Sequence, residues 1–307
     1  GFYWWLCICR SLIWVTWSVD MLESLDTLAP FAVPLAAVLG LVIGSFLNVV
    51  IYRTPVMMER GWTQFAKEHL QLGLTEEERQ PFNLLKPDSR CPKCHAPVRA
   101  WQNIPIVSYL MLGGKCGSCK TPISIRYPLV ELLTGILFAA VAWQYGWSWT
   151  TLGGLILTAV LIALTFIDID TQYLPDQLTL PLIWLGLLFN FDGAFVSLQS
   201  AVLGAVCGYM SLWLLNSFYR LVRGVKGMGA GDFKLLAALG AWLGVGTLPV
   251  LVFMSALVGL AGALIMRVAR NQPFAFGPSL AIAGWVVFTA NESVNQLIRW
   301  WLTKSGF

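Results

Sequence analysis

Long apolar runs dominate this chain, and they constrain its fold more than any other feature. The runs lie at about 31–51, 129–145, 151–167, 178–190, 200–219, 233–245, 248–266 and 279–291. Hydrophobic residues make up 57% of the sequence and charged residues 12%, against about 25% charged residues in soluble domains. Because the bilayer core requires about 20 apolar residues, we predict an all-α polytopic membrane protein with about eight transmembrane helices. The short fourth, sixth and eighth runs leave six or seven spans as alternatives.

The basic residues are distributed unevenly between the loops that join these runs. Of the 20 Lys and Arg residues, 11 lie within 53–127, and six more lie near 220–234 and 267–270. Under the eight-span arrangement only three fall on the other side of the membrane. Cytoplasmic loops carry the excess of basic residues, so we predict that the long polar loop faces the cytoplasm. The net charge of +4 comes from these loops and does not indicate nucleic-acid binding.

Two aspartates lie where an apolar run meets a polar loop. Asp168 ends the third run and Asp232 begins the sixth, so both are expected at the cytoplasmic boundary. Acidic side chains are costly at such positions and usually have a functional reason to remain there. Two aspartates that meet in a partly dehydrated site can share a proton, so that one acts as general base and the other as general acid. The pattern predicts an aspartyl protease within the membrane.

Three further acids are accessory candidates. Asp170 and Asp176 follow Asp168 in the same polar segment, and Glu131 lies near the start of the second run. Asp176 precedes the fourth run and is a candidate helix N-cap, whereas Asp170 is expected deeper in the loop. Glu131 is either a third site acid or an ordinary charge in the first turn of a helix. We favour Asp168 over Asp170 because Asp168 lies nearer to the membrane interior.

Glycines precede Asp232 in the segment Gly227-Met228-Gly229-Ala230-Gly231-Asp232. Gly229 and Gly231 permit positive φ angles and the close approach of another backbone. We therefore expect these two glycines to support a catalytic loop that a substrate strand can reach. The alternative is a simple turn between two helices.

The long polar stretch contains two Cys-x-x-Cys pairs. Their cysteines are Cys91, Cys94, Cys116 and Cys119. Four thiolates with this spacing predict a tetrahedral structural Zn²⁺ site. Reduced free thiols or a redox pair are the alternatives, although a cytoplasmic location disfavours disulfides. Because four cysteines leave no open coordination position, the zinc is expected to stabilise the loop and not to catalyse.

The ends of the chain complete the predicted organisation. Met21 begins a sequence that leads into the first span, so we interpret residues 1–20 as a non-native or upstream extension, with a tryptophan-rich interfacial anchor as the alternative. The predicted units are a first transmembrane helix (21–52), a cytoplasmic zinc-knuckle domain (53–127), a transmembrane protease core (128–295) and a C-terminal tail (296–307).

Several motifs occur in the order found in one known family. They are Gly-Ser-Phe-Leu-Asn-Val-Val (44–50), the two cysteine pairs, Arg-Tyr-Pro-Leu-Val-Glu (126–131), Ile-Asp-Ile-Asp (167–170) with Leu-Pro-Asp (174–176), Gly-Ala-Gly-Asp-Phe-Lys-Leu-Leu (229–236) and Phe-Gly-Pro (276–278). Over about residues 21–295 the chain resembles the bacterial type IV prepilin peptidases, membrane aspartyl proteases with a Gly-x-Gly-Asp motif.

This resemblance implies cleavage of the leader peptide of type IV prepilins and type II secretion pseudopilins at the cytoplasmic face of the bacterial inner membrane. The catalytic aspartates of the family map onto Asp168 and Asp232. Many bacterial members also N-methylate the new amino terminus with S-adenosylmethionine. The long polar loop and the region of Gly44, Ser45 and Asn48 are features of those members. From the residues alone, these three are better explained by helix packing with a hydrogen-bonded cap.

Two other functions remain as alternatives. One is a transporter or channel with a zinc-stabilised cytoplasmic domain, in which the aspartates bind ions. Transport sites usually lie near the membrane midplane, whereas these acids are expected at one face. The other is a related intramembrane protease that lacks methyltransferase activity and cuts another substrate. No glycine-rich nucleotide fingerprint is visible, so the sequence alone does not place a methyl donor site.

Overall fold

The computed structural model describes residues 29–225, 227–265 and 275–290, together with positions 294, 296, 300, 303 and 304. Throughout these residues the chain forms helices and loops, with two isolated β-bridges and no strand. Residues 1–20 and most of 296–307 lie outside the described residues, and so do the expectations that concern them. The all-helical fold class is confirmed.

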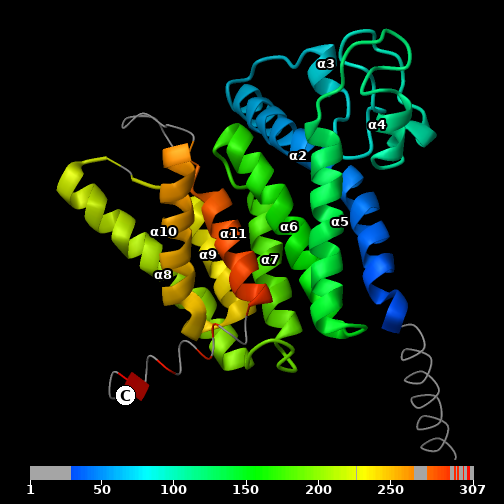
Figure 1. Cartoon of the computed structure of the whole chain (residues 1–307). Helices are drawn as coiled ribbons and strands as arrows, with labels where there is room; N and C mark the ends of the chain where they lie inside the picture. The colour runs from blue at the N-terminus through cyan, green and yellow to red at the C-terminus, as the bar shows by residue number, and fades with distance from the viewer. Residues whose placement is uncertain are drawn as a thin grey trace, which may run out of the picture.

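Eight helices coincide with the eight apolar runs and lie side by side in a bundle (Figure 1). They are α2 (Ala32–His69), α5 (Arg126–Tyr145), α6 (Trp149–Thr171), α7 (Asp176–Phe189), α8 (Leu198–Arg223), α9 (Ala230–Leu243), α10 (Leu248–Ile265) and α11 (Gly277–Thr289). The short helices are η1 (Ala29–Phe31), α3 (Glu76–Arg79), η2 (Ala100–Asn103), α4 (Val107–Met111) and η3 (Val245–Thr247).

Five helical segments of the described chain are long and apolar enough to cross a membrane. They are α2, α5, α6, α8 and the segment Val245–Ile265 that contains α10. The apolar helices α7 and α11 are shorter. These helices confirm a polytopic membrane protein, and the total of eight spans stays a prediction.

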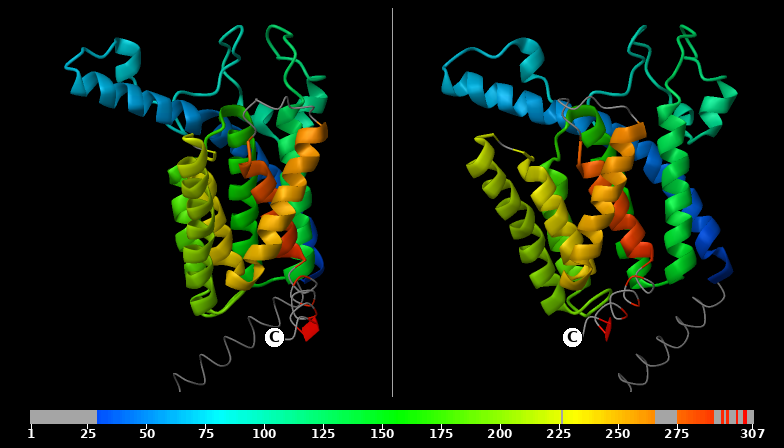
Figure 2. Two further views of the ribbon diagram at one scale, coloured as in Figure 1. Left: turned by 90° about the vertical axis from the view of Figure 1, so that its left-hand side faces the viewer. Right: turned by 60° about the vertical axis from the view of Figure 1, so that its left-hand side comes forward.

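Helix α2 is longer than the predicted first span. It continues past residue 52 to His69, with Pro55 inside the helix. The C-terminal part of α2 extends away from the bundle (Figure 2). A proline within a helix removes one backbone hydrogen bond and causes a kink. The boundary that we placed after residue 52 therefore falls inside α2, and the division into domains stays a prediction.

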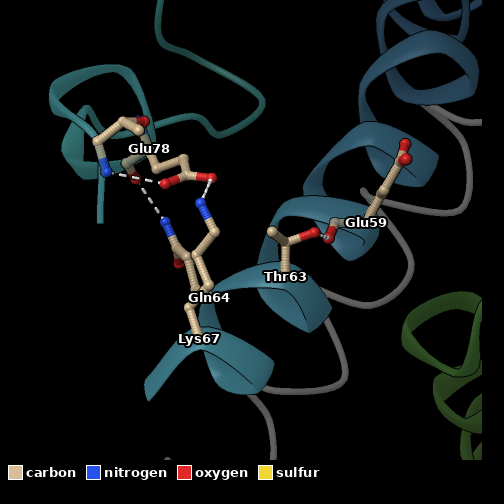
Figure 3. A network of polar contacts seen from close by, with 6 residues as sticks. Glu59, Thr63, Gln64, Lys67 and Glu78 are labelled. Atoms are coloured by element: carbon tan, nitrogen blue, oxygen red, sulfur yellow. Dashed lines mark hydrogen bonds and ion pairs between the residues drawn. The ribbon is translucent and has the colours of Figure 1, made fainter. Parts of the chain in front are cut away.

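Polar contacts join the end of α2 to the short helix α3 (Figure 3). Thr75 and Glu78 form a reciprocal cap, in which the Thr75 N–H donates to Glu78 Oε2 at 2.8 Å. Lys67 Nζ donates to Glu78 Oε1 at 2.5 Å, and Gln64 Nε2 donates to the Glu78 carbonyl at 2.5 Å. The hydrogen bond from Lys67, followed by that from the Thr75 N–H, lowers the pKa of Glu78 to about 2. The carboxylate is therefore charged at neutral pH.

Helix α9 lies in the centre of the bundle, and most of its side chains are buried. Trp242 is fully buried, and its Nε1 donates to the Leu182 carbonyl of α7 at 2.9 Å. Helix α8 packs closely along α9, and the lack of a side chain at Gly208 allows this. A Cβ on Gly208 would lie only 2.7 Å from the Leu236 carbonyl oxygen. Since its neighbours shield α9, this helix of 14 residues need not match the lipid thickness by itself.

The alternating direction of the helices brings three helix ends together. The C-terminal end of α6 and the N-terminal ends of α9 and α11 lie at the end of the bundle that carries α3 and α4 (Figure 1). Helices α7 and α11 each contact both α6 and α9. Residues near 168, 232 and 277, which are far apart in the sequence, therefore lie in one region.

Candidate active site

Asp168 lies in the last turn of α6 and is 4% exposed. The backbone N–H of Gly277, the first residue of α11, donates to Asp168 Oδ2 at 3.0 Å. The first N–H groups of a helix have no partner within the helix, so they are well suited to bind a carboxylate. The start of α11 therefore determines where the Asp168 carboxylate lies.

Asp232 is the third residue of α9 and is 9% exposed. The backbone N–H of Gly229, the N-cap residue, hydrogen-bonds to its carboxylate. Asp168 is close enough for its charge to act on Asp232. The two acids that the sequence singled out are therefore brought into one buried site.

Leu174 packs between the two helix starts at this site. A Cβ on Gly231 would lie 2.7 Å from Leu174 Cβ, and a Cβ on Gly277 would lie 3.2 Å from Leu174 Cδ1. Gly231 therefore allows close packing, although neither Gly229 nor Gly231 has the positive φ angle that we considered from the sequence. At Gly229 the added Cβ would meet only Asp232 Oδ2, at 3.9 Å.

The charges around the two aspartates favour a shared proton. Within the described part of the chain, neither Asp168 nor Asp232 forms an ion pair. Two neighbouring carboxylates that are buried and have no cation repel each other when both are charged, so one of them retains a proton. The pair can then supply a base and an acid to the same reaction.

The neighbouring acids Asp170 and Asp176 are each paired with a cation. Asp170 accepts from both terminal nitrogens of Arg126, at 2.8 and 2.7 Å, and lies within α6, which corrects the expected loop position. Asp176 accepts from Lys234 Nζ at 2.6 and 2.8 Å. Asp176 is the first residue of α7, and Pro175 is the N-cap, so the expected capping role is wrong. These pairs join α5 to α6 and α7 to α9.

The four predicted metal ligands form a cluster on two similar loops. The Sγ atoms of Cys91, Cys94, Cys116 and Cys119 all lie within 4.8 Å of one another. In each loop the first cysteine carbonyl accepts from the N–H of the residue after the second cysteine, which is His95 in one loop and Lys120 in the other. Both of these residues have positive φ, at 56° and 58°. The two loops therefore present their thiols in the same way.

The protonation of two thiols also suits a metal site. The Thr121 hydroxyl, followed by the Thr121 N–H, hydrogen-bonds to Cys119 and lowers the pKa of this thiol to about 6. The N–H groups of Cys94 and Lys93 lower the pKa of Cys91. The Ala96 N–H lowers the pKa of Cys94, but hydrogen bonding with the Cys119 thiol and burial outweigh it and raise this pKa to about 11. Because metals bind the thiolate, the cluster of four sulfurs fits Zn²⁺ by its donor set and by the lowered pKa of Cys91 and Cys119.

Comparison with known proteins identifies the family. Residues 38–145 match the family described as Bacterial Peptidase A24 N-terminal domain, and residues 155–264 match the Type IV leader peptidase family. The prepilin leader peptidase/N-methyltransferase of Neisseria gonorrhoeae is 72% identical over 282 residues, which cover 92% of this chain and 99% of the relative. The chain belongs to the type IV leader peptidase family.

Other type IV leader peptidases are also similar along most of the chain. The Pseudomonas aeruginosa prepilin leader peptidase/N-methyltransferase is 50% identical over 291 residues, covering 92% of this chain and 99% of the relative. The protein of the same name from Aeromonas hydrophila is 51% identical over 269 residues, covering 86% and 92%. No solved structure matches the chain.

In this type IV leader peptidase, the Gly44–Asn48 segment of α2 faces α5. A Cβ on Gly44 would lie 2.7 Å from Glu131 Cα, so glycine allows the two helices to touch. Ser45 Oγ donates to the Asn103 carbonyl at 3.3 Å, and Asn48 Nδ2 donates to the Tyr127 carbonyl at 3.1 Å. The segment therefore packs, as expected, and also positions η2 and the start of α5.

The contacts of Glu131 are made with residues other than Asp168 and Asp232. Glu131 belongs to the second turn of α5, is 8% exposed, and its Oε2 accepts from the Ile106 N–H at 2.8 Å. Among the described residues, no hydrogen bond or electrostatic interaction joins Glu131 to the aspartate pair.

The structure adds residues to which sequence reasoning assigned no role. They are Gly277, Leu174, Arg126 and Lys234. A glycine followed by Pro278 at the start of an apolar run does indicate a helix N-terminus, which could have pointed to Gly277. The ion-pair partners carried no comparable signal, because their acids are distant in the sequence.

Proposed function

We propose that this multi-pass membrane protein cleaves the leader peptide of type IV prepilins and type II secretion pseudopilins and then N-methylates the new amino terminus. Its relatives are named for both activities. The observation that carries the proposal is the pair of buried carboxylates, Asp168 and Asp232, at one end of the bundle. We place this end at the cytoplasmic face of the bacterial inner membrane because the basic residues are concentrated there.

The proposed cleavage is a direct attack by water on the scissile carbonyl carbon. One aspartate of the pair removes a proton from the water, and the other protonates the carbonyl oxygen to give a tetrahedral diol. As the carbon–nitrogen bond breaks, the first aspartate passes its new proton to the leaving amine, and the second takes a proton back from a diol hydroxyl, which restores the pair. No covalent enzyme intermediate is needed. The N–H groups of Gly277 and Gly229 hold the two carboxylates in place during these proton transfers.

The proposed substrate reaches this pair from within the bilayer. A prepilin has an apolar helix, which docks among the membrane-spanning helices of this protein and places the leader junction at the cytoplasmic edge. Around the pair, Gly231 and Leu174 are in tight contact. Gly229, by contrast, has free space beside it and leaves room for a substrate strand.

Two bound groups belong to this proposal. The four cysteines would hold a structural Zn²⁺ ion, which stabilises the two loops and takes no part in catalysis because the thiolates fill its coordination. S-adenosylmethionine would supply the methyl group when bound.

The test is a cleavage assay in detergent with a prepilin that carries a Gly–Phe junction. We expect Asp168→Asn and Asp232→Asn each to lower the cleavage rate at least about 100-fold, because each removes one proton-transfer group. Asp192→Asn, in the exposed turn after α7, is the matched control and should cleave normally.

Two outcomes would contradict the proposal. Near-normal cleavage by either variant of the pair would show that the dyad assignment is wrong. Ion flux through proteoliposomes, with no cleavage by folded parent protein, would favour the transporter alternative.

A further inference from the structure

A cavity of about 540 Å³ lies between the cysteine loops and the neighbouring parts of α2 and α5. Helix α2 contributes Ser45, Asn48 and Tyr52, helix α4 contributes Tyr109, and α5 contributes Tyr127 and Glu131. Asp168 and Asp232 do not line this cavity. Its volume suits a ligand of the size of a nucleoside, since small-molecule sites typically measure about 300–1,000 Å³.

The most informative group in the wall is the Glu131 carboxylate. It is buried, it accepts a hydrogen bond from the Ile106 N–H, and the Ser45 side chain is a second hydrogen-bond partner. Among the described residues, no Lys, Arg or His lies within ion-pair distance of it. Buried carboxylates are normally paired with a cation, because removing the charge from water is costly. A cavity with such a group in its wall is suited to a positively charged ligand.

The other walls offer contacts for a planar ring and for a carboxylate. Tyr52, Phe82, Tyr109 and Tyr127 line the cavity, and aromatic faces attract both cations and flat heteroaromatic rings. Arg90 also lines the cavity and has no ion pair among the described residues. Its guanidinium can therefore bind a carboxylate of the ligand.

One wall is held in place by Arg53. Its guanidinium donates to the carbonyl of Asn83 at 2.9 Å and to that of Pro87 at 2.6 Å. Arg53 is 7% exposed, so α2 fixes the loop that carries Arg90 and Cys91. The wall is therefore built by specific contacts and is not merely a gap between flexible loops.

We propose that this cavity binds the methyl donor S-adenosylmethionine, with the Glu131 carboxylate paired to one of its two cationic groups, the sulfonium or the ammonium. The donor combines a sulfonium, an ammonium, a carboxylate and an adenine ring, and the walls offer a partner for each. The inference rests on the methyl-transfer part of the proposed function. During transfer the amine nitrogen of the new terminus bonds to the methyl carbon as the sulfur–carbon bond breaks, leaving neutral S-adenosylhomocysteine, and one amine proton passes to water.

The start of α5 links this cavity to the aspartate pair. Tyr127 and Glu131 face the cavity, whereas the neighbouring Arg126 reaches Asp170, two residues after Asp168. The first turn of α5 therefore separates the two sites. In this proposal, a newly cleaved amino terminus passes this turn to reach the methyl donor, so that one chain can carry out both steps in sequence.

The first test is calorimetric titration of purified, zinc-loaded protein with S-adenosylmethionine. We expect Glu131→Gln to weaken binding at least about tenfold, because it removes the partner of a buried cation. Glu59→Gln makes the same chemical change at an exposed position of α2 and should bind like the parent (Figure 3). Equal affinity of Glu131→Gln and the parent would overturn the proposal.

The second test uses the parent protein, so it does not depend on the folding of a variant. Ultraviolet cross-linking of radiolabelled S-adenosylmethionine should label peptides from 45–53, 102–112 or 127–131, in competition with S-adenosylhomocysteine. Labelling confined to α7–α11 in a protein that methylates prepilin would overturn the site and leave the proposed function intact. A protein that cleaves prepilin but neither binds the donor nor methylates would refute the methyl-transfer function, and the site with it.

Discussion

The backbone N–H of Gly277 donates a hydrogen bond to Asp168 of the aspartate pair. Its lack of a side chain matters as much as its N–H, because a Cβ at this position would lie 2.6 Å from Asp168 Oδ2. The first residue of α11 thus approaches the Asp168 carboxylate as closely as a hydrogen bond requires. Only glycine permits this approach without displacing the acid.

We therefore expect Gly277→Ala to lower the rate of prepilin cleavage at least about tenfold while the protein remains folded. The added methyl group pushes the Asp168 carboxylate out of position, and small displacements of a catalytic group reduce rates strongly. Steady-state kinetics should show the loss in kcat. Gly229→Ala is the matched comparison, because its Cβ would lie 3.9 Å from Asp232 Oδ2, and it should retain more activity. Similar rates for Gly277→Ala and the parent would contradict the assigned role.

Helices α8 and α9 make the closest of the helix contacts that depend on a glycine in the described chain. Gly204 and Gly208 form a small-residue ridge on α8, and a Cβ on either would meet the backbone of α9 at Gly240 or Leu236. Close backbone packing through small residues is a main source of helix association in membranes. This contact holds α9, which carries Asp232, in the centre of the bundle.

Gly204→Ala should therefore destabilise the protein by about 1–3 kcal/mol, since overpacking forces two backbones apart. The midpoint of thermal unfolding in detergent is the measurement. Gly246→Ala has open space around its Cβ and should leave the midpoint close to that of the parent. If both variants unfold at the same temperature, the α8–α9 contact is not what limits stability.

The two cysteine loops are the other element whose stability depends on a specific contact. Metal analysis of purified protein should find about one zinc ion per chain, and Cys91→Ser should lose it. The loops around 91–95 and 116–120 should then become sensitive to protease, because they contain little other structure. A fully active protein without metal would refute a structural zinc site.

In the whole molecule, the direction of the helices places both proposed sites at one end of the bundle. The α3–α4 region, the start of α9 and the start of α11 lie at the end opposite to the turn between α7 and α8 (Figures 1 and 2). The basic residues of 53–127 lie at the same end as the aspartate pair. The orientation rule for basic loops then predicts that both proposed reactions occur on the cytoplasmic side.

This orientation can be tested with short epitope tags placed after Glu76 in one variant and after Asp192 in another. Protease added to spheroplasts should remove the tag at 192 and leave the tag at 76 intact, because the predicted orientation places only the tag at 192 outside the cytoplasm. The reverse pattern would contradict the predicted orientation. Removal of both tags would contradict the arrangement of the helices.

By itself, the sequence determined the class of the fold and the positions of the helices. An apolar run in a bilayer must satisfy its own backbone hydrogen bonds, so each run predicts a helix without knowledge of its neighbours. The same local argument located Asp168 and Asp232 at the ends of apolar runs, and the spacing of the cysteines predicted their cluster.

Which groups meet depends on how the helices pack, and this could not be read from the sequence. The N–H of Gly277 on Asp168, the pairing of Asp170 with Arg126, and the cavity beside Glu131 all join segments that are distant in the sequence. Glu131 illustrates the limit most clearly, because in the sequence it resembles an ordinary helix charge. Its burial against α2 and its hydrogen bond from Ile106 instead identify it as a buried acid in the wall of the cavity. Such contacts depend on how helices pack, and helix packing is not a local property of any one run.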